Sequence, residues 1–399
     1  MLLFAIYFVH AQYKNDNVLY KTVYTEDLCR ELSANPGYLL LDVRSSGEYA
    51  DTSANYLNVG RFGGAKNINV MDLPNHMDEL YGYKNKPVFV YCSHSQRSRK
   101  ASKMLADSGF TQVININGGM TGIRQLPAKG NECLFSKLVT GNGYSLISPV
   151  DLCQKLARNS IGIFLLDVRS DSAFNHNSKD ALVNAYGVFK NTVHISLKEL
   201  EASLYKVPVN KEIVITDLYG IDAGKAALIL KKRNYSRVSV LTEGIDRFLN
   251  PEIKDPHCLM AHYISPVTYH IMSTIELKTF MDTHTGYLFL DVRTTDEFNN
   301  RSKNYWMNLG HLSGSVNIPA AQLDSNWEKI TAYRTKPVIL YAFSRSAIAY
   351  EAALTLTQKG FTQVYVLQGG IFNIGWTAAN LKGYASLAKL RVDIPADNQ

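Results

Sequence analysis

The sequence predicts an α/β fold made of three similar domains in tandem, each a small, mostly parallel sheet flanked by helices on both faces. Two observations support this prediction. The segment Leu-Asp-Val-Arg, followed by Ser or Thr, occurs at residues 41–45, 166–170 and 290–294. Within each copy, short apolar runs alternate with helix-forming segments. A repeat of roughly 125 residues has the size of a whole domain, so a solenoid of short repeats is excluded.

The elements come in the same order in every copy. A helical segment is expected first, at residues 25–29, 149–153 and 274–278, and the Leu-Asp-Val-Arg segment then ends a strand. A second apolar strand is expected at 87–91, 212–216 and 337–341, followed by a helix. A third strand and a glycine turn close each copy, at 109–119, 235–244 and 360–370. Parallel sheets of this kind place their chemistry beyond the carboxyl ends of the strands.

These repeats divide the chain into three predicted domains, at residues 18–130, 143–250 and 266–385. The segments between them are rich in glycine and asparagine near 130–143 and in proline near 250–266, as linkers commonly are.

The first twelve residues form a short apolar run that ends in small residues. We interpret residues 1–12 as the end of a truncated signal peptide, because the basic start of such a peptide is missing. This interpretation predicts a periplasmic or secreted protein. The alternatives are a cytoplasmic protein whose N-terminus is simply hydrophobic, or a first strand. The sequence has no other apolar stretch long enough to span a bilayer, so no stable membrane insertion is expected.

The composition is that of a folded globular protein, with 46% hydrophobic and 19% charged residues. The net charge is +7 and no run of five basic residues occurs, so nucleic-acid binding is not expected. Glycine-rich nucleotide motifs and His/Cys clusters are also missing from the sequence, and we therefore expect no cofactor and no metal.

The chain has five cysteines, an odd number, and they are widely spaced, so the sequence indicates neither a disulfide framework nor a zinc site. Cys29 and Cys153 share one helical position, where the third copy has Lys278, and we interpret them as helix residues without chemistry. Cys133 and Cys258 fall in the linkers. They are expected to be bystanders, although exposed linker thiols could pair in an oxidising compartment.

The fifth cysteine, Cys92, ends the second strand of the first copy. Small and polar residues follow it, with Arg97 and Arg99 among them, and a helix is expected from Lys100. A loop between a strand and a helix N-terminus collects backbone N–H groups and positive charge, which favours a thiolate and hence a nucleophilic sulfur. The alternative is a buried cysteine that ends a core strand.

Taken in this order, the motifs resemble the rhodanese or sulfurtransferase domain. The resemblance is carried by the Leu-Asp-Val-Arg strand end, the turn at 310–319, the loop from Cys92 to Ser98, and a Gly-Phe-x-x-Val segment followed by Gly-Gly. The third copy closes with Trp376. The resemblance covers nearly the whole chain, as three domains.

The resemblance implies that Cys92 is the catalytic residue and accepts a sulfane sulfur as a persulfide. It also implies two further groups of residues. The amides of Ser93, His94, Ser95, Gln96, Arg97 and Ser98 would line the donor pocket. As our own hypothesis we add Arg99 to the donor-binding residues, and we expect Arg97, Arg99 and Arg61 to neutralise the leaving sulfite. The structural residues would be Asp42, which braces loops, and Arg44, which pairs with Glu48.

The other two copies lack a thiol at the position of Cys92. The second copy has Asp217 there, with Asp222 opposite Arg97, and the third has Ala342, or Phe343 if one gap is allowed. We expect both copies to be silent, because a carboxylate or a methyl group cannot accept a sulfane sulfur. Ser95 stands where the family often has glycine, at a position that favours a positive φ.

The predicted function is sulfur transfer from thiosulfate or a similar small anionic donor to cyanide or a thiol. One alternative is a non-catalytic array that serves as a binding scaffold or redox sensor, with a protein partner on the silent domains. A less favoured alternative is a phosphatase or arsenate reductase of the same fold. The loop from Cys92 to Arg97 is C-x4-R, however, and the resemblance associates phosphatases with a longer C-x5-R loop.

Overall fold

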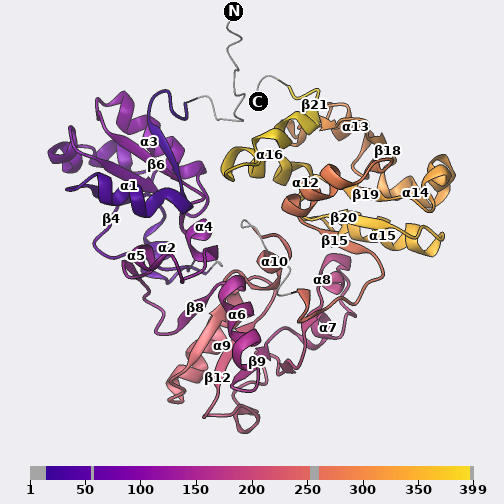
Figure 1. Cartoon of the computed structure of the whole chain (residues 1–399), viewed down its shortest axis with the longest axis horizontal. Helices are drawn as coiled ribbons and strands as arrows, with labels where there is room; N and C mark the ends of the chain where they lie inside the picture. The colour runs from indigo at the N-terminus through magenta and orange to yellow at the C-terminus, as the bar shows by residue number, and fades with distance from the viewer. Residues whose placement is uncertain (1–14, 55–57, 252–259, 396–399) are drawn as a thin grey trace, which may run out of the picture. The chain divides into compact units, whose positions relative to one another are not determined.

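The structure of this 399-residue chain is a computed structural model that describes residues 15–54, 58–251 and 260–395 (Figure 1). The predicted signal segment at 1–12 and the linker residue Cys258 lie outside the described residues. Residues 15–266, with the first two domains, form one compact unit. The third domain, from Val267 onward, belongs to a second unit.

Each domain is built on a five-stranded parallel sheet of the same strand order. In the first domain this order is β1-β6-β5-β2-β4. The strands are β1 Lys21–Tyr24, β2 Leu39–Asp42, β4 Lys66–Asn67, β5 Val88–Tyr91 and β6 Val113–Asn117. The helices are α1 Leu28–Ala34, α2 Ser46–Ala50, α3 Gln96–Asp107, α4 Gly119–Gln125 and α5 Glu132–Phe135. A short antiparallel pair joins β3 Arg61–Phe62 to β7 Leu138–Val139.

The second domain repeats this order as β8-β13-β12-β9-β11. Its strands are β8 Ser145–Ile147, β9 Ile163–Asp167, β11 Val193–His194, β12 Glu212–Thr216 and β13 Val238–Leu241. Its helices are α6 Pro149–Asn159, α7 Asp171–Phe174, α8 Ala181–Ala185, α9 Ile221–Lys232 and α10 Gly244–Leu249. Here the short antiparallel pair is β10 Val188–Phe189 with β14 Tyr263–Ile264.

The third domain has the order β15-β20-β19-β16-β18. Its strands are β15 His270–Met272, β16 Leu288–Asp291, β18 Val316–Asn317, β19 Val338–Tyr341 and β20 Val364–Leu367. Its helices are α12 Thr274–Thr283, α13 Thr295–Phe298, α14 Ala320–Asn326, α15 Ala347–Gln358 and α16 Gly370–Asn380. The antiparallel pair is β17 His311–Leu312 with β21 Arg391–Val392. The predicted α/β class, with three tandem domains, is therefore confirmed.

Both faces of the first sheet are buried, as expected of a parallel sheet covered by helices. Along β5, Val88 and Val90 pack on the side of α3, whereas Phe89 and Tyr91 pack on the side of α1 and α4. The alternation continues past the strand, so Cys92 lies on the same side as Val90.

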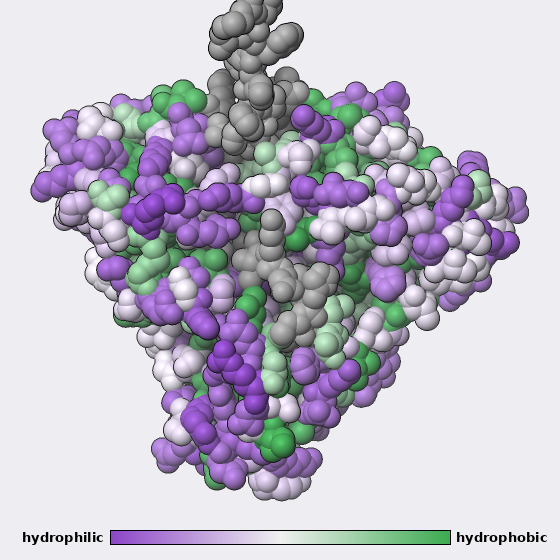
Figure 2. All heavy atoms as spheres, viewed as in Figure 1, coloured by the Kyte–Doolittle hydropathy of each residue, from purple (hydrophilic) through white to green (hydrophobic). Residues whose placement is uncertain are grey.

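Figure 2 shows hydrophilic side chains over most of the face in view, with hydrophobic ones in small scattered areas.

Helix α3 begins at Gln96, four residues before the predicted start at Lys100. The preceding residue, Ser95, has φ 129° and ψ −30°, which turns the chain sharply from the loop into the helix. Arg97 and Arg99 therefore stand in the first turn of α3 rather than in the loop. The positive φ expected at Ser95 is present, and a residue other than glycine adopts it at a cost of about 1–3 kcal/mol.

A disulfide bond joins Cys29 in α1 to Cys133 in α5, with 6.1 Å between the Cα atoms. Cys153 is disulfide-bonded as well. The expectation of no disulfide framework is therefore wrong. Cys29 and Cys153, interpreted as helix residues without chemistry, are covalently bonded, and Cys133, expected to be a linker bystander, lies in α5 and pairs with Cys29. The sequence carries a signal for this: Cys29 and Cys133 are 104 residues apart, and Cys153 and Cys258 repeat that spacing almost unchanged in the next copy.

Candidate active site around Cys92

Cys92 lies at the carboxyl end of β5, and it is the free cysteine among the residues that the structure describes. Its side chain is only 1% exposed and packs against the apolar cluster under α3. The polar side of the sulfur faces the loop. The Ser95 N–H donates to Sγ at 3.1 Å, and Sγ lies 3.7 Å from the hydroxyl oxygen of Ser98. The thiol is thus both buried, as in the alternative considered above, and held at a helix N-terminus.

Ser95 is kept in its unusual conformation by its own hydroxyl group. This hydroxyl donates to Asn117 Oδ1 at 3.0 Å and accepts from the backbone N–H of Gly118 at 2.7 Å. Arg99 donates to the same Asn117 oxygen at 2.7 Å and also pairs with Asp16 at 3.0 Å. The start of α3, the end of β6 and the turn before α4 therefore fix the backbone that points an N–H group at the sulfur.

Asn115 is a residue of the site that sequence reasoning missed. It stands in the middle of the apolar strand β6, and its Oδ1 accepts from the Ser98 hydroxyl at 2.6 Å. The same strand position holds Val240 in the second domain and Val366 in the third. A polar residue at this strand position in only the cysteine-bearing copy is a signal that comparison of the repeats could have found.

Helix α4 closes the loop from the other side. The N–H groups of Met120 and Thr121 donate to the carbonyl oxygens of Cys92 and Ser93 at 2.9 and 3.0 Å. The approach is so close that a Cβ atom on Gly119 would lie 2.4 Å from the Cys92 oxygen. This is the physical reason for the second glycine of the closing turn.

Arg97 forms an ion pair with Glu48 of α2. Its Nη1 and Nη2 donate to the two carboxylate oxygens of Glu48 at 2.6 and 2.7 Å, and Nη2 also donates to Ser93 Oγ at 2.9 Å. Burial raises the pKa of Glu48, but the hydrogen bonds and charge of Arg97 outweigh it and lower this pKa to about 2. Glu48 is therefore ionised wherever the protein is folded at ordinary pH.

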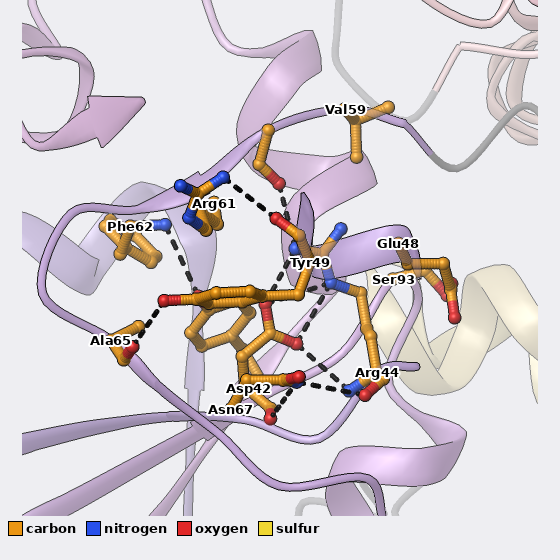
Figure 3. A network of polar contacts seen from close by, with 12 residues as sticks. Asp42, Arg44, Glu48, Tyr49, Val59, Arg61, Phe62, Ala65, Asn67 and Ser93 are labelled. Carbon is orange, nitrogen blue, oxygen red and sulfur yellow. Dashed lines mark hydrogen bonds and ion pairs between the residues drawn. The ribbon is translucent and has the colours of Figure 1, made fainter. Parts of the chain in front are cut away.

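The predicted pair of Arg44 with Glu48 is wrong. Arg44 is fully buried and pairs with Asp42, two residues before it, with Nη2 and Oδ2 at 2.7 Å (Figure 3). A second bond from Arg44 Nη2 goes to the carbonyl oxygen of Gly60. The Asp42 carboxylate at the end of β2 supplies the ion-pair partner of Arg44. Glu48 therefore pairs with Arg97 instead. The equivalent pairs recur in the other domains, as Arg169 with Asp167 and Arg293 with Asp291.

The remaining predicted residues lie at the edge of the loop. The ring of His94 is half-buried, with Nδ1 3.0 Å from Ser93 Oγ, and Gln96 is exposed at the start of α3. Arg61 stacks on the ring of Tyr49 and donates to the Tyr49 carbonyl oxygen at 2.9 Å (Figure 3). The structure therefore gathers residues 93–99 around Cys92, whereas Arg61 contacts Tyr49 of α2. A cavity of about 220 Å³ lies nearby, lined in part by Asp51 and Glu243 but not by Cys92.

In the second domain the loop that corresponds to this one is occupied by its own carboxylate. Asp217 accepts N–H bonds from Gly220, Asp222 and Ala223, and Ile245 N–H donates to its carbonyl oxygen as Met120 does to Cys92. Burial raises the pKa of Asp217 to about 6, although the three N–H groups oppose this shift. The amide cradle is therefore kept in this domain, with an oxygen anion in place of sulfur.

In the third domain the position of Cys92 belongs to Ala342, whose carbonyl oxygen accepts from Ile371 N–H at 3.0 Å. Phe343 follows it, and its ring contacts Trp306 and Phe372 at centroid distances of 5.1 and 5.9 Å. An aromatic side chain with aromatic neighbours thus directly follows the position of the sulfur. Among the described residues of the whole chain, no group of three or more His, Cys, Asp or Glu is placed to hold a metal ion.

Comparison with known proteins agrees with this geometry. The family model of the Rhodanese-like domain matches residues 25–126, 148–251 and 273–377, which is most of the chain. The chain belongs to the rhodanese-like family. The predicted family is thus confirmed, and the three rhodanese-like domains share one fold and differ at the position of the sulfur. In the part of the chain that the structure describes, no helix has both the length and the apolar character needed to cross a membrane.

Relatives of known sequence match single domains. The uncharacterized protein YqhL of Bacillus subtilis is 29% identical over 124 residues, which cover 30% of this chain and 86% of that protein. The tRNA uridine(34) hydroxylase of Cytophaga hutchinsonii is 37% identical over 92 residues, which cover 22% of this chain and 27% of the hydroxylase. Among solved structures, thiosulfate sulfurtransferase from Pseudomonas aeruginosa is 18% identical, with 87% of this chain and 66% of that chain covered and a TM-score of 0.21.

Proposed function

We propose that the first domain is a sulfurtransferase in which Cys92 carries a sulfane sulfur from thiosulfate, or a similar small anionic donor, to cyanide or a thiol. The observation that carries the proposal is the contact of Cys92 Sγ with the Ser95 N–H, at the start of the twelve-residue helix α3. An N–H group and the positive end of a helix dipole stabilise an anionic sulfur, both as a thiolate and as a persulfide.

The proposed reaction has two displacement steps. Cys92 first loses its proton to solvent. Its thiolate attacks the outer sulfur of thiosulfate, the sulfur–sulfur bond of the donor breaks, and sulfite leaves with the electron pair. Cyanide or an acceptor thiolate then attacks the outer sulfur of the Cys92 persulfide and releases the Cys92 thiolate. No net oxidation occurs. Because the Cys92 side chain is 1% exposed, the loop at 93–95 has to move before a donor can reach Sγ.

The ion pairs around Cys92 indicate which groups stabilise the leaving sulfite. Arg97 and Arg99 each pair with a carboxylate, of Glu48 and Asp16 respectively. We therefore assign the stabilisation of the leaving sulfite mainly to the loop N–H groups and the α3 dipole, with the arginines fixing the loop.

The experiment is sulfur uptake by Cys92. Purified protein is exposed to thiosulfate, and intact mass and peptide mapping show whether one sulfur atom is added at Cys92; thiocyanate formation from cyanide measures turnover. The wild type is expected to do both, and Cys92→Ser neither. Uptake without turnover would point to a sulfur carrier. If Cys92 takes up no sulfur, the proposal is wrong, and a binding scaffold or redox sensor is favoured instead. Hydrolysis of a phosphate ester would favour a phosphatase.

The two other domains are proposed to be catalytically silent and to serve in binding, including binding of a protein partner. This is supported by the carboxylate in the loop of the second domain and by the aromatic side chains in that of the third. A periplasmic or secreted location is likewise a proposal. It is supported by the Cys29–Cys133 disulfide, since such bonds persist mainly in oxidising compartments.

A further inference from the structure

The second domain reaches into the Cys92 site of the first. In the last turn of the short helix α10, Arg247 places Nη2 3.4 Å from Nε2 of His94, the loop residue two positions after Cys92. Arg247 is itself held by Glu243, to which its Nε and Nη2 donate at 2.8 and 2.7 Å. The side chains of Arg247 and Glu243 are 7% and 5% exposed, so this ion pair is buried against the first domain.

The pair occupies positions where the other two domains have small residues. Glu243 stands where the first domain has Gly118 and the third has Gly369. All three begin a helix with positive φ: 82° for Gly118, 56° for Glu243 and 76° for Gly369. Glycine adopts this conformation freely, whereas glutamate does so at a cost of conformational energy. Arg247 likewise replaces a glycine, Gly122, and an asparagine, Asn373. The second domain therefore has a charged pair, with Glu243 in a strained backbone conformation, at the place where it meets the loop.

Glu243 also faces the first domain. Burial raises its pKa, but the charge of Arg247 and the nearby Thr121 hydroxyl outweigh burial and lower it. Thr121 belongs to α4, and its N–H group holds the carbonyl oxygen of Ser93. The pair therefore contacts the loop directly at His94 and indirectly through α4.

The contact also selects one form of His94. An arginine side chain can only donate hydrogen bonds, so Nε2 of His94 must accept from Arg247. The ring proton is then on Nδ1, which is 3.0 Å from Ser93 Oγ and can donate to it. Ser93 Oγ in turn accepts from Arg97 of the first domain. Two arginines, one from each domain, thus fix the two residues that follow Cys92.

We propose that Glu243 and Arg247 are positioning residues which the second domain supplies to the Cys92 site. They hold His94 in place and keep the loop closed over the buried sulfur, so that access to Cys92 depends on the contact between the domains. The inference rests on the proposed role of Cys92 as the reacting group, but it does not require thiosulfate to be the donor.

The experiment is a double-mutant cycle read by alkylation of Cys92 with iodoacetamide, a neutral reagent, in the full chain. The four proteins are the wild type, H94A, R247N and H94A/R247N. We expect R247N to raise the alkylation rate about three- to tenfold, the change that the loss of one ordinary hydrogen bond gives. H94A should raise it similarly, and R247N should add nothing in the H94A background. An unchanged rate in R247N, or effects that add in full, would overturn the proposal.

Two further variants guard against trivial outcomes. Glu243→Gly removes the carboxylate that holds Arg247 and introduces the residue that the other two domains have there, so it is expected to fold and to raise the alkylation rate. Lys225→Ala, on the same domain but 61% exposed and paired with Asp222, should leave the rate unchanged. A thermal midpoint equal to that of the wild type excludes general unfolding. If the cycle shows coupling while thiosulfate adds no sulfur, the proposed function fails and this inference stands.

Discussion

The ion pair between Arg97 and Glu48 allows a quantitative prediction. Glu48 has its pKa lowered from 4.5 to about 2 because, against the effect of burial, Arg97 binds its carboxylate. Such a shift corresponds to ~3 kcal/mol of stability. A lowered acid pKa contributes stability that is complete above the ordinary value of 4.5 and is lost as the pH falls through about 2. Arg97 is 31% exposed, so solvent weakens the pair and we expect Glu48→Gln to cost about 2 kcal/mol at pH 7.

The chain offers a matched control at Glu297 of the third domain. Both glutamates form a capping box at the start of a helix, Glu48 with Ser45 and Glu297 with Thr294. Glutamine can replace glutamate in such a box, so the capping contribution changes little in either variant. Glu297→Gln, on an exposed helix end, is expected to cost less than about 0.5 kcal/mol. The difference between the two variants therefore measures the Arg97 contact.

The first domain can be followed by the labelling of its buried thiol. Without urea, Cys92 is reached by local movement of its loop, whereas added urea exposes it by opening the whole domain, so the urea-dependent part of its labelling gives the free energy of opening. The three tryptophans, Trp306, Trp327 and Trp376, all lie in the third domain and report on Glu297→Gln by fluorescence. Hydrogen exchange between pH 5 and pH 2 should show an acid-induced loss of protection in the wild type that is smaller in Glu48→Gln. Equal effects of the two variants would refute the reasoning.

Two other predictions concern the second domain and the disulfide. Asp217→Cys should create a second reactive thiol, because the N–H groups of Gly220, Asp222 and Ala223 already point at that position. Peptide mass mapping after exposure to thiosulfate or iodoacetamide measures its reaction. A thiol that stays unmodified would show that the loop geometry is not sufficient. The double variant C29S/C133S should lower the free energy of opening of the first domain by about 3–5 kcal/mol, because the disulfide closes a loop of 104 residues. The urea dependence of Cys92 labelling measures this change in free energy.

The elements that could be predicted from sequence are those fixed by local pattern and by repetition. The strand ending in Asp42 and the glycine turn at Gly118–Gly119 are recognisable because each recurs in the other copies. The start of α3 was misplaced because it depends on Ser95, whose positive φ is maintained by contacts with β6 and not by local preference.

The residues that could not be predicted are those whose partners are remote in sequence. Glu48 and Arg97 are 49 positions apart, and nothing near Glu48 indicates that Arg44 already has a partner in Asp42. His94 and Arg247 are 153 positions apart and belong to different domains. Such pairs depend on how loops and domains meet, which sequence periodicity does not encode. Asn115 is an intermediate case, because comparison of the three copies distinguishes it from valine.

The bond between Cys29 and Cys133 encloses nearly the whole first domain, and the Cys92 loop with it, in a single covalent ring. A protease that cuts the backbone once anywhere inside this ring cannot separate the two pieces. On a non-reducing gel, a chain nicked there would still migrate with the intact protein, and only added dithiothreitol would release the fragments. Proteins that operate among extracellular proteases benefit from such tolerance of single cuts.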